Sequence, residues 1–195
     1  MDKKETIFQM IKEHHKKTFE KAIKEGKMDL EFIPLCKHIA KTKNFFTSSC
    51  CAGRIVLVSL DQKERKKESA FHRKWHRKVN YNEVKKGVDL FNGEVLWLKQ
   101  EPIILHIGAK DLENSKKILA ICEKVGVKRF GIKVAKEGKF LIEIVGTHSI
   151  NIPIKEGKIV ISDEYLKYIL KKCNKKFEKN QATLKNFTKE IKKIK

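Results

Sequence analysis

The sequence lacks the segments that direct a protein to a membrane or anchor it there. None of its apolar runs approaches the roughly 20 residues needed to span a bilayer, and the N-terminal MDKKETIFQM has no apolar core of a secretory signal. We therefore expect a cytoplasmic protein without membrane contact. Hydrophobic residues make up 41% of the 195 residues, as in globular proteins. The simplest organisation is a single domain over 1–195, and two small lobes sharing a core are the alternative.

Common cofactor-binding loops are also missing. The chain has neither the G-x-G-x-x-G loop of a Rossmann fold nor the G-x-x-x-x-G-K-[ST] of a P-loop. No DPPY-like motif of the amine methyltransferases appears either. A nucleotide or cofactor pocket in this chain must therefore be built in another way.

No two cysteines form a C-x-x-C pair, which excludes a four-cysteine zinc knuckle. The five cysteines are Cys36, Cys50, Cys51, Cys122 and Cys173. Their odd number predicts free thiols in a reducing compartment. A zinc site of Cys50 or Cys51 with His72 and His76 remains as an alternative, because histidines at i and i+4 share a helix face. Adjacent cysteines chelate one ion poorly, so we expect no metal.

Acidic residues are too few to balance the basic ones. Lys and Arg number 45 against 24 acids, giving a formal net charge of +21. Such a charge attracts polyanions, so nucleic acid is the leading class of partner. Heat adaptation is the alternative source of the lysine excess, but it usually raises Glu together with Lys.

Apolar periodicity and turn residues predict an α+β fold with a mostly antiparallel sheet and a long basic C-terminal helix. We expect helices over 5–25, 29–42, 82–91, 112–125 and 163–195, and strands over 54–60, 103–109, 130–135, 140–146, 150–154 and 158–162. Asp29, Asp111 and Asp163 are the candidate N-caps. The last four strands are joined in pairs by KEGK-type turns, which indicates two hairpins.

Two segments do not fit a plain structural reading. The charged stretch 61–80 is too long for a tight turn and too polar for a core, so we expect a functional flap or a surface hairpin. Residues 47–54 gather hydroxyls, a glycine that allows close backbone approach, and Arg54, whose planar fork suits carboxylate or phosphate. The alternative for 47–54 is a polar turn before a strand, with Arg54 paired locally.

The stretch FFTSSCCAGRI resembles the FFTTSSCSGRI signature of the tRNA wybutosine-synthesising protein 3 family. Further segments resemble the family in order along nearly the whole chain: GKMD with IPL, KWHRKV, LWLKQEPIILHI, RFGI, GTHSINIPI and KKCNKKF. Cys50 departs from the pattern, because the family usually has Ser there and a thiol is a poor hydrogen-bond donor. Ala52 and Phe130 are further departures.

The resemblance implies an S-adenosyl-L-methionine-dependent methyltransferase without a Rossmann fold. Its reaction would methylate N4 of a demethylwyosine-type base at position 37 of tRNA(Phe), in the wybutosine pathway of archaea. The partner would be the tRNA(Phe) anticodon arm, and no obligate protein partner is evident. A non-catalytic basic RNA-binding protein is the alternative function.

The resemblance also supplies candidate site residues. The implied cofactor-binding residues are Ser48, Ser49, Cys51, Gly53, Arg54 and Gly131. Cys51 is read as a pocket wall, because methyl transfer needs no covalent enzyme intermediate. Sequence leaves open whether Arg54 binds the cofactor carboxylate or a tRNA phosphate. His106 and His76 are the candidates to accept a proton. For His106 the alternative is a hydrogen-bonded core histidine, and for His76 it is a phosphate contact.

The implied RNA-binding residues are Trp75, Arg77, Asn174 and Lys175. Trp75 either stacks on a base or clamps the 61–80 stretch by hydrophobic packing. Trp97 is expected in the core. From Glu164 onward the chain carries 11 Lys against 3 Glu, so the last helix is expected to contact the RNA backbone without reading its sequence.

Overall fold

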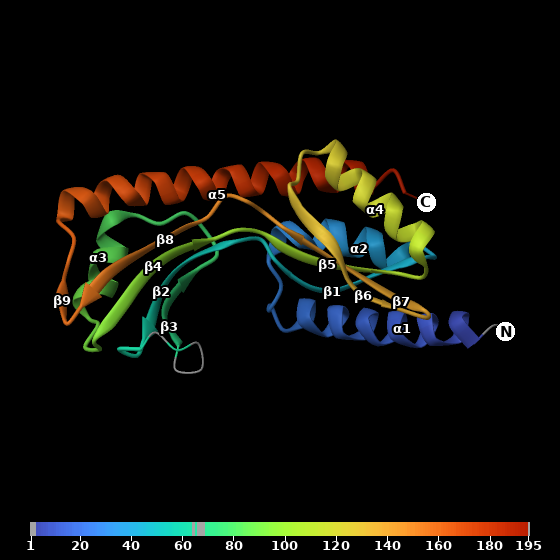
Figure 1. Cartoon of the computed structure of the whole chain (residues 1–195), viewed down its shortest axis with the longest axis horizontal. Coiled ribbons are helices and arrows are strands. Elements are labelled where there is room, and N and C mark those ends of the chain that lie inside the picture. Colours follow the sequence, from blue (N-terminus) through green and yellow to red (C-terminus); the bar gives the residue numbers. More distant parts are fainter. Residues whose placement is uncertain (1–2, 64, 66–68, 195) are drawn as a thin grey trace. The chain divides into compact units, whose positions relative to one another are not determined.

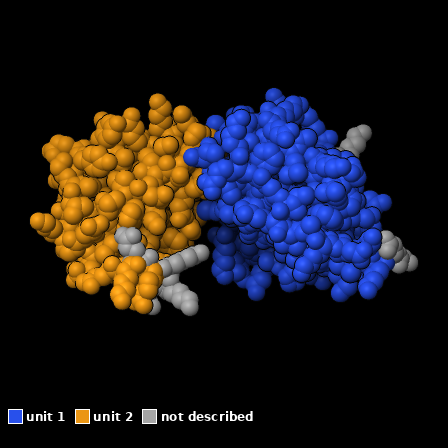
Figure 2. Space-filling view, in the orientation of Figure 1, with its two compact units in different colours: residues 1–52, 103–147, 181–195 blue, residues 53–102, 148–180 orange. Residues whose placement is uncertain are grey.

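The computed structural model describes residues 3–63, 65 and 69–194. These residues form two compact units, coloured separately in Figure 2. Unit 1 comprises the described residues of 1–52, 103–147 and 181–195, and unit 2 those of 53–102 and 148–180. No described helix is long and apolar enough to cross a bilayer.

Unit 1 is built on a four-stranded antiparallel sheet with the order β1-β5-β7-β6. Its strands are β1 (Phe45–Cys51), β5 (Ile104–Ala109), β7 (Lys139–Val145) and β6 (Arg129–Lys136). Its helices are α1 (Lys3–Lys24), the 3-10 turn η1 (Leu30–Phe32), α2 (Ile33–Lys41) and α4 (Leu112–Lys124). The last turns of α5 (Asp163–Ile191) also belong to this unit.

The two faces of the unit 1 sheet are covered differently. Alternate residues of β5 and β7, among them Ile107 and Ile142, pack into one core with α2, α4 and the end of α5. On the other face α1 packs against one end of β1, where the rings of Phe8 and Phe46 lie 5.9 Å apart (Figure 1). Gly108 lies under Phe46, and a Cβ there would come within 2.0 Å of its ring. The middle of this face carries polar side chains.

Unit 2 is built on a five-stranded antiparallel sheet with the order β3-β2-β4-β8-β9. Its strands are β3 (Ala70–Trp75), β2 (Arg54–Leu60), β4 (Val95–Glu101), β8 (Ile150–Glu156) and β9 (Lys158–Ile159). Helix α3 (Tyr81–Asp89) and the first part of α5 cover one face, on which Ile55 and Leu98 lie in the core (Figure 1).

The α+β fold with antiparallel sheets and a long basic C-terminal helix is confirmed. The strand over 54–60 is found with the predicted bounds. The carboxylate of Asp111 accepts a hydrogen bond from the Asn114 N–H, so this N-cap prediction holds as well. Only Lys158–Ile159 of the predicted strand 158–162 is extended and paired.

Several local predictions are wrong. Residues 47–51 of the stretch 47–54 belong to strand β1, so the alternative of a polar turn there is wrong. Asp29 precedes a 3-10 turn without capping it by its side chain. Asp163 lies inside α5, where the hydroxyl of Ser162 accepts from the Tyr165 N–H instead. Asp29 and Asp163 are of a residue type that caps helices, but tertiary contacts direct their side chains elsewhere.

The charged stretch 61–80 contains strand β3, which pairs with β2, so its described residues form the surface hairpin of the two alternatives. Residues 64 and 66–68 of this stretch lie outside the described residues. Strand β4 was not predicted, because Lys and Gln interrupt its apolar run.

Candidate active site

Four polar side chains form a connected row across the open face of the unit 1 sheet. Ser49 lies opposite His106 in the register of β1 and β5, and His106 lies opposite Glu143 in that of β5 and β7. Ser49 Oγ is 2.7 Å from His106 Nδ1, and His106 Nε2 is 3.2 Å from Glu143 Oε2. Lys133 Nζ ends the row, 2.8 Å from Glu143 Oε1. We call Ser49, His106, Glu143 and Lys133 the polar row.

The ionised carboxylate of Glu143 determines which atoms of the polar row donate and which accept hydrogen bonds. The hydrogen bond from Lys133, and after it the one from His106, holds the pKa of Glu143 below its usual value against the effect of burial. An ionised carboxylate only accepts, so His106 donates from Nε2. Its Nδ1 is then an acceptor facing the Ser49 hydroxyl. In this arrangement the Ser49 hydroxyl donates to His106 Nδ1.

Strand alternation explains why these side chains meet. His106 stands between Leu105 and Ile107, and both of these apolar neighbours face the core. Glu143 stands in the same way between Ile142 and Ile144. A register shift between Thr47 and Ser49 bends β1 at this point, and bulges of this kind re-aim side chains near functional sites. Ser49 is exposed, whereas the side chains of His106 and Glu143 are 19% and 26% exposed.

A cavity of about 280 Å³ adjoins the end of the polar row formed by Glu143 and Lys133. It is lined by Arg129, Phe130, Gly131, Ile132, Lys133, Glu143 and Val145. Gly131 lies opposite Glu143 in the register of β6 and β7. A Cβ at Gly131 would meet no atom within 4 Å, so a ligand can approach the backbone closely there. The cavity offers cations and a carboxylate beside a proton acceptor.

The neighbours of Ser49 along β1 lie in different environments. Cys50 packs against the core, with its sulfur 4.0 Å from that of Cys36, and hydrogen bonding to that thiol and then burial raise the pKa of Cys50. Ser48 lines a small cavity of about 70 Å³ between β1, α1 and α2. Cys51 is half-buried and pairs in register with Ile104. Cys50 lines the same cavity as Ser48, and all three residues are partly buried.

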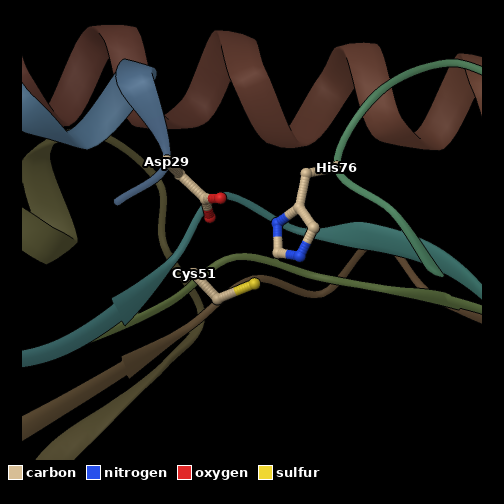
Figure 3. Close-up of side chains that lie close together, drawn as sticks. All are labelled: Asp29, Cys51 and His76. Atoms are coloured by element: carbon tan, nitrogen blue, oxygen red, sulfur yellow. The ribbon is translucent and has the colours of Figure 1, made fainter. Parts of the chain in front are cut away.

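Two side chains fix the backbone that follows Cys51. The Ala52 N–H donates to the carboxylate of Asp29 at 2.6 Å, and the Ala52 carbonyl accepts from Gln181 Nε2 at 2.8 Å. Figure 3 shows Asp29 and Cys51, whose carboxylate and sulfur atoms lie within 4.8 Å of each other. Asp29, which sequence assigned to a helix cap, is thus a support for the end of β1.

The structure contradicts the helix on which the zinc alternative depended. His72 lies on strand β3, so it and His76 do not share a helix face, and His72 Nε2 is 2.8 Å from the Gly87 carbonyl oxygen. Taken by itself, neither unit gathers three His, Cys, Asp or Glu ligands among its described residues.

Unit 2 holds the remaining candidates for cofactor binding. Gly53 has a φ of 88°, which favours glycine at the step into β2. Arg54 donates from Nε to Glu101, its register partner on β4. Its guanidinium carbon also lies 4.4 Å from the centre of the Phe71 ring. Arg54 is therefore already paired, as the local-pairing alternative expected.

The predicted RNA-binding residues of unit 2 have varied surroundings. Asn174 accepts from the Val79 N–H at 3.0 Å and donates to the Val79 carbonyl at 2.8 Å, so its amide is engaged with backbone. Arg77 makes a two-pronged ion pair with Glu83. Lys175 and His76 are exposed.

The two tryptophans lie on different faces of the unit 2 sheet. Trp75 is half-buried and packs against the unit 2 core, in line with the clamp alternative. Trp97 is also half-buried, but it lines a cavity on the opposite face of the sheet and is not part of the core. The expectation of a core Trp97 is wrong because β4 alternates, and Leu96 and Leu98 take the core positions.

Sequence reasoning missed Glu143 and Lys133. One signal was available for Glu143, since it is the single acid in the strand FLIEIV and alternation places it on the face opposite the core. No comparable signal marked Lys133, one of 45 basic residues. The position of Lys133 depends on a register shift in β6 between Ile132 and Val134, which the sequence does not predict.

The fold and site define a basic α+β protein without a Rossmann sheet, in which one face of the unit 1 sheet carries a hydrogen-bonded polar row beside a cavity. Residues 2–193 match the model of the family Methyltransferase TYW3. The chain belongs to this methyltransferase family.

Relatives match over almost the whole chain. A protein of Thermococcus kodakarensis named tRNA(Phe) 7-((3-amino-3-carboxypropyl)-4-demethylwyosine(37)-N(4))-methyltransferase 1 is 31% identical over 188 residues, covering 96% of this chain and 95% of that protein. A Methanocaldococcus jannaschii protein of the same name, without the final numeral, is 32% identical over 186 residues, with coverages of 94% and 91%. The solved structure of PH1069 protein from Pyrococcus horikoshii has a TM-score of 0.91 and 30% identity, covering 96% of this chain and 97% of that one.

Proposed function

We propose that this chain is the S-adenosyl-L-methionine-dependent methyltransferase that methylates N4 of 7-(3-amino-3-carboxypropyl)-4-demethylwyosine at position 37 of tRNA(Phe), acting in the cytoplasm on the anticodon arm. Membership of the family and the names of the relatives support the reaction class. The observation that carries the proposal is the hydrogen-bonded polar row from the exposed Ser49 to Glu143, next to an open cavity.

The cavity beside the polar row fits the cofactor chemically. S-Adenosyl-L-methionine supplies an electrophilic methyl group when it is bound. Arg129 and Lys133 offer cations for its carboxylate, and Gly131 permits close approach to the backbone. The roles of Ser48, Cys51, Gly53 and Arg54 as cofactor contacts remain predictions.

The polar row handles the proton. The target nitrogen gains a methyl group and loses a proton, and Ser49 together with His106 Nδ1 accepts that proton. Glu143, held ionised by Lys133, stabilises the imidazolium that forms. Positioned general-base catalysis of this kind contributes about 10²- to 10⁴-fold in rate. The remaining acceleration comes from alignment of the nucleophile, which is worth roughly 7–11 kcal/mol.

The basic residues supply the attraction for the RNA. The described lysines of α5, Lys175 among them, are mostly exposed and contact the phosphate backbone without reading sequence. Asn174 serves this binding indirectly, by holding the Val79 backbone that follows the predicted contacts His76 and Arg77. Trp75 holds β3 against α3 by packing.

A methylation assay tests the proposal. The protein and S-adenosyl-L-methionine are incubated with tRNA(Phe) that carries the demethylwyosine precursor, and the digested nucleosides are weighed by mass spectrometry. We expect the gain of one methyl group on the tricyclic base, lowered about 10²-fold or more in His106→Asn and reduced in Ser49→Ala. The matched control is His14→Asn, because His14 is exposed on α1 and outside the row.

Two outcomes would count against the proposal. A folded protein that binds the tRNA tightly but transfers no methyl group would support the non-catalytic RNA-binding alternative. Normal turnover by both His106→Asn and Ser49→Ala would keep the enzyme but remove the polar row from its mechanism.

A further inference from the structure

The face of the unit 2 sheet that α3 and α5 leave uncovered carries aromatic and basic side chains in ordered rows. Phe71 of β3 and Trp97 of β4 are both register partners of Val58, so the two rings flank one central valine. Lys74 and Lys99 flank Val56 in the same way. We call Phe71, Trp97, Lys74 and Lys99 the aromatic–lysine face.

Geometry places these side chains in one concave surface. A cavity of about 470 Å³ is lined by Arg54, Val58, Leu60, Ser69, Phe71, Trp97, Lys99 and Glu101. The Lys74 ammonium lies 5.6 Å from the centre of the Phe71 ring, and that of Lys99 lies 5.6 Å from Trp97. Each ring therefore has a cation within the range of a cation–π contact.

Folding accounts for only part of these residues: they help to bury Val56 and Val58, and Arg54 packs on the Phe71 ring. The core of unit 2 lies on the other face of the sheet, where Ile55, Leu57 and Leu98 pack with α3 and α5. Phe71 remains 51% exposed, so about half of its surface stays in contact with water. A large ring that stays exposed beside lysines on a hollowed face indicates a binding surface.

The charge of the face selects the ligand. Glu101 is the acid among the residues named, and Arg54 pairs with it, so Lys74 and Lys99 leave the surface positive. An RNA chain offers both groups that such a surface binds: a base with a π-face for the rings and phosphates for the lysines. S-Adenosyl-L-methionine fits less well, because it carries no phosphate and is itself cationic.

We propose that the aromatic–lysine face binds an unpaired nucleotide of the RNA substrate. The base stacks on Phe71 or Trp97, and the flanking phosphates lie against Lys74 and Lys99, one row further along the strands. Rows on one face of a strand are about 6.7 Å apart, within the reach of a base and its own phosphate. This inference rests on the proposed function only in taking RNA as the substrate.

Tryptophan fluorescence tests the stacking directly. The full-length protein is titrated with a short unstructured oligoribonucleotide, and the signal is compared between the wild type and Trp97→Phe. We expect quenching in the wild type. In Trp97→Phe the quenching disappears, while binding followed by fluorescence anisotropy of labelled RNA persists, because phenylalanine keeps a stacking ring.

Affinity measurements on two further variants test the rows. Phe71→Ala is expected to weaken binding of the oligoribonucleotide about fivefold to a hundredfold. Lys99→Ala is expected to reduce the slope of log K against log salt by about 0.7 for each phosphate that the lysine no longer neutralises. The matched controls are Leu90→Ala and Lys158→Ala, which alter exposed residues of unit 2 outside this face and should change neither quantity.

Three results would overturn the inference. Equal quenching by a duplex of the same length would mean attraction by charge without stacking. Saturable quenching by S-adenosyl-L-methionine but not by RNA would make this face a cofactor pocket. Unchanged affinity in folded Phe71→Ala and Trp97→Ala would remove the rings from binding. The methylation assay on the wild type decides the proposed function separately, because fluorescence reports binding whether or not a methyl group moves.

Discussion

Replacement of Glu143 by glutamine tests the role of the negative charge in the polar row. The amide keeps the shape of the side chain but removes the anion that faces His106 Nε2 and Lys133 Nζ. If Glu143 stabilises an imidazolium, the variant binds both substrates normally and transfers the methyl group more slowly. Glu143 is thus a positioning residue that acts through His106.

The size of the effect follows from the charged hydrogen bond that the substitution removes. Hydrogen bonds to charged groups are worth about 1.5–3 kcal/mol, which corresponds to about tenfold to a hundredfold in rate. Because 26% of the Glu143 side chain is exposed, screening by solvent places the expected decrease near the lower end. The measurement is a single-turnover rate with pre-bound tRNA, together with dissociation constants for the cofactor and the tRNA.

Glu137→Gln is the matched control, since Glu137 lies in the turn between β6 and β7 with a side chain that is 68% exposed. A single-turnover rate in Glu143→Gln equal to that of the wild type would refute the assigned role. A slower rate accompanied by an equal decrease of cofactor affinity would instead make Glu143 a cofactor-binding residue.

The Glu143→Gln variant also tests how the stability of the fold depends on pH. The pKa of Glu143 lies below its ordinary value of 4.5 in the folded protein, so its ionised form stabilises the fold above that value. This contribution is lost as the pH falls through the lowered pKa. The difference in thermal midpoint between wild type and Glu143→Gln should therefore be present at pH 6 and shrink below about pH 4.5.

Two further predictions concern the rest of the chain. Asn174→Ala leaves the backbone of the buried Val79 without its two amide partners, which should lower the free energy of unfolding by about 2–4 kcal/mol in urea titrations. Lys175→Ala, the control, should leave the free energy of unfolding unchanged. An Asn174→Ala variant that is as stable as the wild type but binds tRNA weakly would support a direct contact between Asn174 and the RNA. Dialysis against EDTA should change neither the melting temperature nor methyl transfer, whereas a decrease of either would point to a bound metal.

The elements that sequence predicted well are those with a strong local signal. Strand 54–60 is a continuous β-branched run, and helix α4 has a capping aspartate and a regular apolar stripe. Strand β1 was missed because its FFTSSCC carries small polar residues that are typical of turns. Its extended conformation is imposed by pairing with β5, a partner more than 50 residues away, and local propensity holds no information about that pairing.

The candidate site divides along the same line. His106 and Ser49 were available from sequence, because a family signature marked them. The contact between the side chains of His106 and Ser49 could not be predicted, because it depends on the register of β1 against β5 and on the bulge after Thr47. Glu143 and Lys133 join through two further register relationships.

The predicted cofactor site centred on residues 47–54, which are adjacent in the chain, whereas the structure joins side chains across strands. Cys50 illustrates the difference: it is a neighbour of Ser49 along the chain, yet strand alternation directs it into the core beside Cys36. The Ser-to-Cys departure at position 50 therefore changes the packing beneath the sheet and leaves the hydrogen bonds of the polar row intact. A chain with Cys50→Ser should accordingly keep its rate of methyl transfer, because position 50 faces away from Ser49 and His106.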